Sequence, residues 1–381
     1  MPSTPDWDIF CNVIDNYGDI GVCWRLARQL YAEHRLHVRL WVDDLPSLQK
    51  ICPEINPGLS SQSADGVQIR HWAKPFSDEQ PAGVVIEAFG CELPESYIEA
   101  MAECEQKPVW INLEYLSAED WVPGCHGLPS PHPRLPLVKY FFFPGFVPGA
   151  GGLLLENDLM QQSKRFRQAP HALDDFWAEW GLPVPRPEEL RVSLFGYENN
   201  AVSALFDTWS RAESPVCCLV PEGRILADVS GYFSQPDLAP GMLLNKGALD
   251  VRVLPFVEQA RYDQLLWACD CNFVRGEDSF VRAQWAARPF VWQIYPQQEE
   301  AHFKKLTAFL DMYCAGLPQE VAHDVRLFWE AWNRGAGAGE VWGQFWRHGT
   351  VLDAHAERWA KHLAQNGDLA SNLVQFCKNK L

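Results

Sequence analysis

Short apolar runs alternate with amphipathic segments along the first half of the chain. The runs at residues 7–13 and 37–42 are typical of strands, and residues 19–34 between them carry apolar side chains at helical spacing. Further strand-like runs occur at residues 84–90 and 108–115, with a helix-like segment between them. Alternation of this kind is typical of a mostly parallel sheet covered by helices, so we expect the first half to be a doubly wound domain.

The middle of the chain breaks this pattern and then the pattern resumes. Residues 116–170 are rich in Pro and Gly and are expected to form loops and short elements, and GLPVPRPEE at 181–189 marks a break. A second strand-then-helix series begins at LRVSLFGYENN and continues to residue 295, and the residues after 320 are helical and rich in Trp. We therefore predict an α/β protein with the divisions 1–182, 183–355 and 356–381, the last a helical segment that packs back on the first domain.

Length and charge narrow the function classes. A chain of 381 residues exceeds what one core usually serves, which favours two domains with a ligand cleft between them. The formal net charge of −17 argues against a nucleic-acid or anionic-membrane surface, because either needs a basic face. A basic macromolecular partner fits this charge, although solubility alone also explains an acidic protein.

The cysteines and the N-terminus indicate the compartment. The chain has 12 cysteines, but none forms a CxxC pair and many lie in apolar runs, where free cysteine acts as a small hydrophobe. The N-terminal MPSTPDWDIF lacks the pattern of a secretory signal, and no stretch is as long and apolar as a membrane span. We expect a cytoplasmic protein.

The loop after the first predicted strand reads VIDNYGDIG and carries two carboxylates, Asp15 and Asp19. In a doubly wound sheet this loop leaves the carboxyl end of a central strand, where ligands bind. The two side chains are therefore candidates for catalysis. The structural alternative is that Asp19 caps the following helix and Asp15 shapes the turn.

A second candidate site is FVRGEDSFVRAQWA, in which a strand-like run ends at a short loop before a helix. The N–H groups at such a helix start, with the Ser279 hydroxyl and the Arg275 guanidinium, can hold a diphosphate without metal. Glu277 could accept hydrogen bonds from ribose hydroxyls, and Asp278 lies beside it. The structural alternative is an ordinary capping box with a surface ion pair.

Aromatic residues form a third candidate element, and metal motifs are missing. Phe195 and Tyr197 of FGYEN, with Phe256, could make a wall for a flat base, although aromatic residues at strand ends are more often core. The sequence has no HExxH, no paired-cysteine motif, no convincing DxD stretch, no GxSxG and no P-loop. We expect no metal and no other cofactor.

The segments VIDNYGDIG, FGYEN, RGEDS and PFVWQIYPQQEEAH occur in an order that resembles the family of protein-arginine rhamnosyltransferases acting on translation elongation factor P, over nearly the full length. The resemblance implies a GT-B fold with two Rossmann-like domains facing a central cleft. It also implies inverting transfer of rhamnose from dTDP-β-L-rhamnose to one arginine of elongation factor P.

The resemblance also implies roles for the candidate residues. It makes Asp15 and Asp19 the carboxylates of the catalytic loop, with Asp19 favoured over Asp15 as the general base and the choice between them left open. It makes the remaining candidates ligands of the donor nucleotide sugar, namely Phe195, Tyr197, Phe256, Arg275, Glu277, Asp278 and Ser279.

Three other readings compete with this function. Another nucleotide-sugar transferase acting on a glycan or a lipid would have a similar donor loop. A nicotinamide-dependent oxidoreductase is disfavoured because GxGxxG is missing. A non-catalytic nucleotide-sugar binding protein is disfavoured, but not excluded, by the presence of both Asp15 and Asp19.

Overall fold

The computed structural model describes residues 6–15, 17–76, 79–169, 171–186, 188–297 and 300–381. The chain divides into two compact units: unit 1 is Met1–Asn157 with Leu363–Leu381, and unit 2 is Asp158–His362. This division falls before helices α5 (Leu159–Gln168) and α6 (Ala172–Glu179), which the sequence pattern placed in the first domain. The last helix is part of unit 1, whose C-terminal segment begins at Leu363, whereas the predicted third division began at residue 356.

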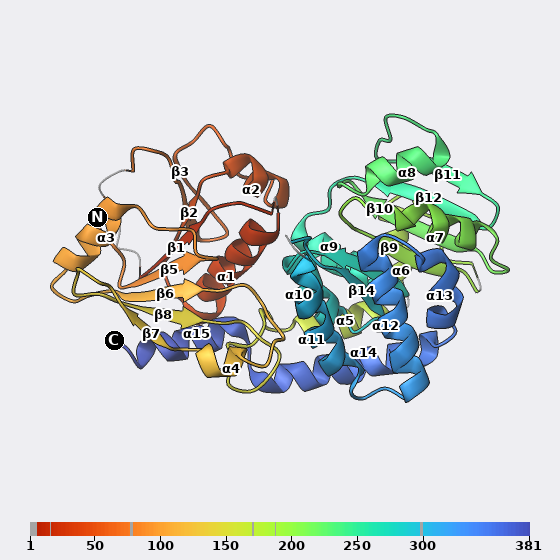
Figure 1. The fold of residues 1–381 in the computed structure, drawn as a ribbon. Coiled ribbons are helices and arrows are strands. Elements are labelled where there is room, and N and C mark those ends of the chain that lie inside the picture. The colour runs from red at the N-terminus through yellow and green to blue at the C-terminus, as the bar shows by residue number, and fades with distance from the viewer. Residues whose placement is uncertain (1–5, 16, 77–78, 170, 187, 298–299) are drawn as a thin grey trace. The chain divides into compact units, whose positions relative to one another are not determined.

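Unit 1 is built on an eight-stranded sheet with the order β3-β4-β2-β1-β5-β6-β8-β7 (Figure 1). Only the edge strands β3 and β7 pair antiparallel with their neighbours in the described sheet. β1, β2, β5 and β6 are buried along their whole length, which is why they appear in the sequence as nearly continuous apolar runs. The strands are β1 (Trp7–Cys11), β2 (Val38–Val42), β3 (Ser61–Ala64), β4 (Val67–His71), β5 (Val84–Ala88), β6 (Val109–Leu113), β7 (Pro129–Pro131) and β8 (Val138–Phe142).

The helices of unit 1 cover this sheet, and the chain's last helix joins them. α15 packs against α1, and Gln29 of α1 donates a hydrogen bond of 3.0 Å to the Asp368 carboxylate at the start of α15. The described helices are α1 (Gly18–His34), α2 (Leu45–Ile51), α3 (Glu95–Glu103), α4 (Val122–Cys125), the 3₁₀ turn η2 (Ala364–Asn366) and α15 (Leu369–Lys378).

Unit 2 has a six-stranded sheet with the order β11-β12-β10-β9-β13-β14. The strands are parallel except for the edge strand β11, which pairs antiparallel with β12. They are β9 (Leu190–Leu194), β10 (Val216–Pro221), β11 (Leu243–Lys246), β12 (Leu249–Leu254), β13 (Cys271–Arg275) and β14 (Phe290–Gln293).

Aromatic side chains fill the core of unit 2. The ring of Phe273 on β13 lies 4.8 Å from Trp332 and 6.1 Å from Trp209, so three elements meet at one strand residue. No helix in the described part of the chain combines the length and the hydropathy that a membrane crossing requires. Besides α5 and α6, the helices are α7 (Ala201–Ser210), α8 (Leu226–Phe233), α9 (Gln259–Ala268), α10 (Asp278–Ala286), α11 (His302–Cys314), α12 (Gln319–Arg334), α13 (Ala338–Trp346) and α14 (Gly349–Leu363).

The strand orders define one topological switch point in each unit. In unit 1 the first strand, β1, lies between β2 and β5, and in unit 2 β9 lies between β10 and β13. The connections from the two strands of such a pair leave in opposite directions, and the crevice between them is where open α/β sheets bind ligands. The loop after β1 and the loops after β9 and β13 therefore occupy the ligand-binding edges of their sheets.

Candidate active site

The loop after β1 is held in place by a carboxylate from the neighbouring strand end. β1 ends at Cys11, two residues before the apolar run does, because the next residues turn toward Asp43. The Asn12 side-chain amide and the Val13 N–H donate hydrogen bonds of 2.5 and 2.9 Å to the two Asp43 carboxylate oxygens. These bonds anchor the loop before it reaches the candidate catalytic residues.

Asp19 lies in the first turn of α1 and is only 2% exposed. One of its oxygens, Oδ2, accepts hydrogen bonds from the N–H groups of Ile14 at 2.8 Å and Asp15 at 2.9 Å. The N-cap residue of α1 is Tyr17, and its side chain makes no capping bond. Asp19 therefore does not cap its helix in the expected way, because it binds the N–H groups of the preceding loop.

Burial sets the proton affinity of Asp19. Removal from water raises the pKa of its carboxyl above the ordinary value of 3.8, and the nearby Asp15 carboxylate raises it further. The two backbone N–H groups and the hydroxyl of Tyr115 act in the opposite direction, since hydrogen bonds to a carboxylate favour its charged form. The result is a carboxylate that accepts a proton more readily than an exposed aspartate does.

Asp15 lies against the first residue of the same helix. The Gly18 N–H donates a hydrogen bond of 2.6 Å to the Asp15 carbonyl, and a Cβ on Gly18 would lie 2.8 Å from Asp15 Oδ2. Any larger residue at position 18 would displace this carboxylate. The structure thus brings Asp15 and Asp19 together at one helix start, as the sequence predicts.

Arg275 ends β13 and is 4% exposed. Its guanidinium carbon lies 4.8 Å from the ring centre of Phe195 and 4.5 Å from that of Tyr197. β9 and β13 are neighbours, so the FGYEN and RGEDS segments leave the sheet side by side. A cation stacked on aromatic faces is attracted by them, which holds the guanidinium at the strand end.

The turn after Arg275 is fixed by backbone contacts. Gly276 has a φ of 61°, a conformation that favours glycine, and its carbonyl accepts a hydrogen bond of 2.8 Å from the Trp292 indole. The Ser279 hydroxyl accepts the Arg275 N–H at 3.1 Å and donates to the Arg275 carbonyl. Ser279 therefore closes the loop on itself in this structure.

The two acidic residues of this loop differ. Glu277 occupies the N-cap position of α10, is partly exposed, and makes no capping bond with its side chain. Asp278 accepts hydrogen bonds from Arg282 at 3.0 Å and from Gln259 at 3.1 Å, and Arg282 also pairs with Asp263 at 2.7 Å. Asp278 thus takes part in a largely buried ion-pair network between α9 and α10, which differs from the capping box with a surface ion pair considered as the structural alternative.

The three aromatic candidates differ in burial and in position along the sheet edge. Tyr197 is 2% exposed and its N–H donates a hydrogen bond of 2.9 Å to the Gln293 side chain, whereas Phe195 is only partly buried. Phe256 follows β12, two strands away from β9, and its N–H donates a hydrogen bond of 3.0 Å to Glu222. Phe195 and Tyr197 therefore gather at Arg275, and Phe256 lies further along the same edge.

Sequence reasoning missed two residues that position this chemistry. Tyr115 follows β6 and reaches Asp19, and Gln293 ends β14 and accepts the Tyr197 N–H. Both stand at the carboxyl ends of parallel strands, so the rule that singled out Asp15 could have found them.

Among the described residues, one group of side chains has the spacing of a metal site. Ligand atoms of Glu320, Asp324 and His348 lie within 4.8 Å of one another. Asp324, however, accepts hydrogen bonds from Arg347 at 2.9 Å and pairs with His348 at 3.0 Å. The Arg347 guanidinium already compensates the charge of this carboxylate, and none of the three residues belongs to the loops described above.

Comparison with known proteins shows which family this chain resembles. Residues 7–378 match the model of the family described as elongation factor P (EF-P) rhamnosyltransferase EarP. The protein-arginine rhamnosyltransferase of Pseudomonas aeruginosa is 51% identical over 97% of this chain and 98% of its own length. The protein-arginine rhamnosyltransferase of Neisseria meningitidis is 35% identical over 97% of this chain and 96% of its own.

Solved structures support the fold. A structure described as the basis for EarP-mediated arginine glycosylation of translation elongation factor EF-P matches with a TM-score of 0.72 and 36% identity, over 99% of this chain and 100% of the other. A UDP-glucosyltransferase from Polygonum tinctorium matches with a TM-score of 0.52 and 10% identity over 99% of both chains, which is a likeness of fold alone. The predicted α/β fold of the GT-B type is thereby confirmed.

Proposed function

The chain belongs to the EarP family of EF-P rhamnosyltransferases, and on that premise we propose that it transfers L-rhamnose from dTDP-β-L-rhamnose to a guanidinium nitrogen of one arginine of elongation factor P, with inversion at the anomeric carbon. The coarser activity follows from the family itself: the chain is a glycosyltransferase of the protein-arginine rhamnosyltransferase class.

The acceptor chemistry explains the need for two carboxylates. An arginine side chain stays protonated, with a pKa of roughly 12 or more, and its lone pairs are delocalised, so it is a poor nucleophile. Asp15, partly exposed at the helix start, is suited to grip the guanidinium. Asp19 takes the proton as the nitrogen attacks the anomeric carbon from the face opposite the leaving dTDP. One displacement of this kind inverts the configuration.

The donor chemistry uses the RGEDS loop. As the sugar leaves, negative charge grows on the diphosphate, and the Arg275 guanidinium with the N–H groups at the start of α10 can stabilise it. Glu277, partly exposed at the N-cap of α10, accepts hydrogen bonds from the sugar hydroxyls of the nucleoside in this proposal. Phe195 and Tyr197, whose rings both lie against the Arg275 guanidinium, are the aromatic candidates for contact with the base. No metal is needed in this scheme, since fixed cations and backbone dipoles supply the charge.

The observation that carries the proposal is the buried Asp19 carboxylate, held by two loop N–H groups at 2.8 and 2.9 Å beside a second carboxylate. An enzyme that must deprotonate a guanidinium needs a base of raised proton affinity in a fixed position. A protein that only binds a nucleotide sugar does not need one.

The test is a transfer assay with purified protein, intact elongation factor P and several nucleotide sugars. We expect dTDP-β-L-rhamnose alone to add one rhamnosyl group to one arginine, seen by mass spectrometry, with the α-anomer identified by NMR. The reaction should proceed in excess chelator. Transfer from another nucleotide sugar, or to a glycan or lipid in place of the protein, would overturn the assignment, and recovery of lost activity by Mg²⁺ or Mn²⁺ would overturn the metal-free scheme.

A further inference from the structure

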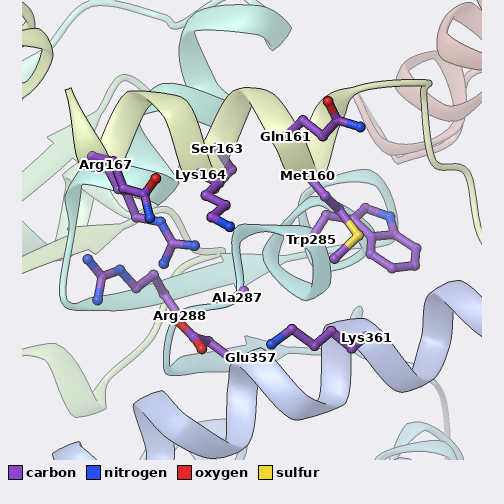
Figure 2. A pocket seen from close by; sticks show the side chains of 11 residues that line it. Met160, Gln161, Ser163, Lys164, Arg167, Trp285, Ala287, Arg288, Glu357 and Lys361 are labelled. Atoms are coloured by element: carbon purple, nitrogen blue, oxygen red, sulfur yellow. The ribbon is translucent and has the colours of Figure 1, made fainter.

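A cavity of about 620 Å³ in unit 2 lies among α5, the turn after α10, and α14 (Figure 2). This volume falls within the range of about 300–1,000 Å³ that is typical of small-molecule sites. Its lining comes from three segments: Met160, Gln161, Ser163, Lys164, Arg167 and Gln168; Trp285, Ala287 and Arg288; Glu357 and Lys361.

The lining is strongly basic in a protein of net charge −17. It contains four cations, Lys164, Arg167, Arg288 and Lys361, against the single carboxylate of Glu357. Outside the lining, Asp353 pairs with Arg288 at 2.9 Å, which leaves an excess of about two positive charges. Such a concentration of like charge within an acidic chain is unfavourable unless an anion compensates it.

The pKa of one lining arginine reflects the same repulsion between cations. The pKa of Arg167 is lowered, first by burial and next by the nearby charge of Arg288. In Figure 2 these two guanidinium groups lie at one end of the cavity, while Lys164 reaches into it from α5 and Lys361 from α14. Two adjacent guanidinium groups form a fork that matches the oxygens of a phosphate group.

Two lining side chains have a buried polar atom without a hydrogen-bond partner in the described part of the chain. In the part of the chain that the structure describes, Ser163 Oγ and Arg288 Nε are both buried and make no hydrogen bond. The Ser163 residue is only 2% exposed, so water does not satisfy its hydroxyl from outside. A buried donor without an acceptor is costly, and both atoms belong to side chains that line the cavity.

The cavity is separate from the candidate donor loop. α10 begins at Asp278, next to the carboxyl end of β13, and ends at Ala286, just before the amino end of β14. A helix of nine residues spans about 13 Å. Arg288 therefore stands at the edge of the sheet opposite to Arg275.

We propose that this cavity is a second ligand site, which binds a small organic phosphate or diphosphate. The four cations hold the phosphate oxygens. Trp285 and Met160, at the other end in Figure 2, form the apolar wall for the organic part. The assignment does not depend on the identity of the glycosyl donor or acceptor.

Calorimetric titration of the full-length protein with pyrophosphate tests the proposal, and the same titration of Arg275→Gln, which lacks the cation of the candidate donor loop, separates the cavity from that loop. We expect a binding event that weakens as salt is added and that persists in Arg275→Gln, and tighter binding of phenyl phosphate than of inorganic phosphate. Lys164→Ala and Arg167→Gln should each weaken pyrophosphate binding by about tenfold or more, since a charged hydrogen bond contributes roughly that factor.

Matched controls come from the same helices. Arg165 of α5 and Arg358 of α14 are exposed and do not line the cavity. Arg165→Ala and Arg358→Ala should leave pyrophosphate affinity within about twofold of wild type, because they remove the same charge elsewhere. Melting curves identify any variant that misfolds, and Lys164→Ala is the safer of the two test variants because its side chain is exposed.

Several results would overturn the proposal. These are the absence of a pyrophosphate binding event in folded Arg275→Gln, equal losses in the control and test variants, and citrate binding as tightly as pyrophosphate. The first two would remove the site, and the third would remove its phosphate chemistry. Failure of rhamnose transfer would leave this titration unaffected, so the two proposals fail separately.

Discussion

The loops after β1 and after β13 occupy equivalent positions at the switch points of their sheets, yet they carry opposite charge. The first presents the carboxylates of Asp15 and Asp19 at a helix start, and the second presents the Arg275 guanidinium beside aromatic rings. Under the proposed function the first meets a cationic guanidinium and the second an anionic diphosphate. Under that proposal, one topology serves two ligands of opposite charge through the side chains at the strand ends.

The two loops are also stiffened differently. In unit 1 the functional carboxylate itself holds the loop, because Asp19 accepts the N–H groups of Ile14 and Asp15. In unit 2 a separate residue, Ser279, closes the loop through the backbone of Arg275. Removing charge should therefore affect catalysis in unit 1 and removing a hydroxyl should affect loop order in unit 2.

The largest effect is expected for Asp19→Asn. The amide keeps the shape and one acceptor oxygen, but it cannot take a proton from the guanidinium, and loss of general-base assistance costs about 10² to 10⁴ in rate. Single-turnover transfer at saturating donor and acceptor measures the loss, and dTDP affinity should be unchanged. A rate within a few-fold of wild type would reduce Asp19 to a loop anchor, with Asp15 or Glu114 next to be tested as the base.

Asp15→Asn is the matched comparison within the same loop. If Asp15 grips the acceptor guanidinium, its variant should show a larger rise in the KM for elongation factor P than Asp19→Asn does. Equal KM values for the two variants would contradict the division of roles between them.

A further prediction concerns the acceptor, which we expect to be recognised as a folded domain and not as a short peptide. The acidic chain and its family indicate recognition of a folded acceptor over a surface, whereas the donor is small. A peptide with the acceptor loop would lose binding area and pay more ordering entropy, so its kcat/KM should fall by at least about tenfold relative to the intact domain. Added salt should slow the reaction of the domain if charge steers docking. Equal specificity constants would exclude surface recognition.

Much of the fold could be predicted because the central strands are buried on both sides. β1 and β5 both appear as apolar runs whose limits lie within two residues of the observed ones. The edge strand β3, SQSA, carries no apolar run, since one side faces solvent, and β8 lies in the Pro- and Gly-rich stretch that was expected to form loops and short elements. Periodicity reports burial, so it misses strands that are not fully buried.

The site could be predicted only as far as chain position determines it. Asp15 and Asp19 are four residues apart at a helix start, so their proximity follows from the sequence. The stacking of Arg275 on Phe195 and Tyr197 depends on β9 and β13 being neighbours, which no local pattern encodes. The bonding of Ser279 to the Arg275 backbone likewise depends on backbone angles at Gly276.

In the donor loop, Glu277→Ala should weaken dTDP binding by about tenfold through loss of the hydrogen bonds to the nucleoside sugar. Calorimetric titration measures this affinity. Glu258 is the matched control because it is an exposed glutamate at the N-cap of another helix, α9. Unchanged affinity in Glu277→Ala, or an equal loss in Glu258→Ala, would remove Glu277 from the donor site.

Ser279→Ala should also weaken dTDP binding, but the structure gives it a different signature. Because the hydroxyl bonds to the Arg275 backbone, its loss should lower the melting temperature as well as the affinity, whereas Glu277→Ala should lower affinity alone. Ser279→Thr keeps the hydroxyl and should restore both. Weakened binding with an unchanged melting temperature would favour direct contact of Ser279 with the diphosphate.

The smallest expected effect is that of Asp19→Asn on the melting temperature, which should not fall, whereas that of Ser279→Ala should. Burial raises the pKa of Asp19 above 3.8, so between 3.8 and the folded-state value the native protein binds more protons than the unfolded chain. Stability contributed by this group therefore falls as the pH rises through that window, and at pH 7 the ionised carboxylate destabilises the fold.

Asn removes this charge, and its oxygen can still accept the N–H groups of Ile14 and Asp15. Asp19→Asn should melt at or above the wild-type temperature at pH 7, by no more than about 2–4 °C, the shift that 1 kcal/mol produces in a domain of about 150–250 residues. The difference should narrow as the pH is lowered toward 3.8, because the wild-type carboxyl then becomes neutral as well. Melting curves of both proteins from pH 8 downward measure this. A variant that melts several degrees lower at pH 7 would show that the charged carboxylate stabilises its loop, and Asp19 would then be retained for structure more than for proton transfer.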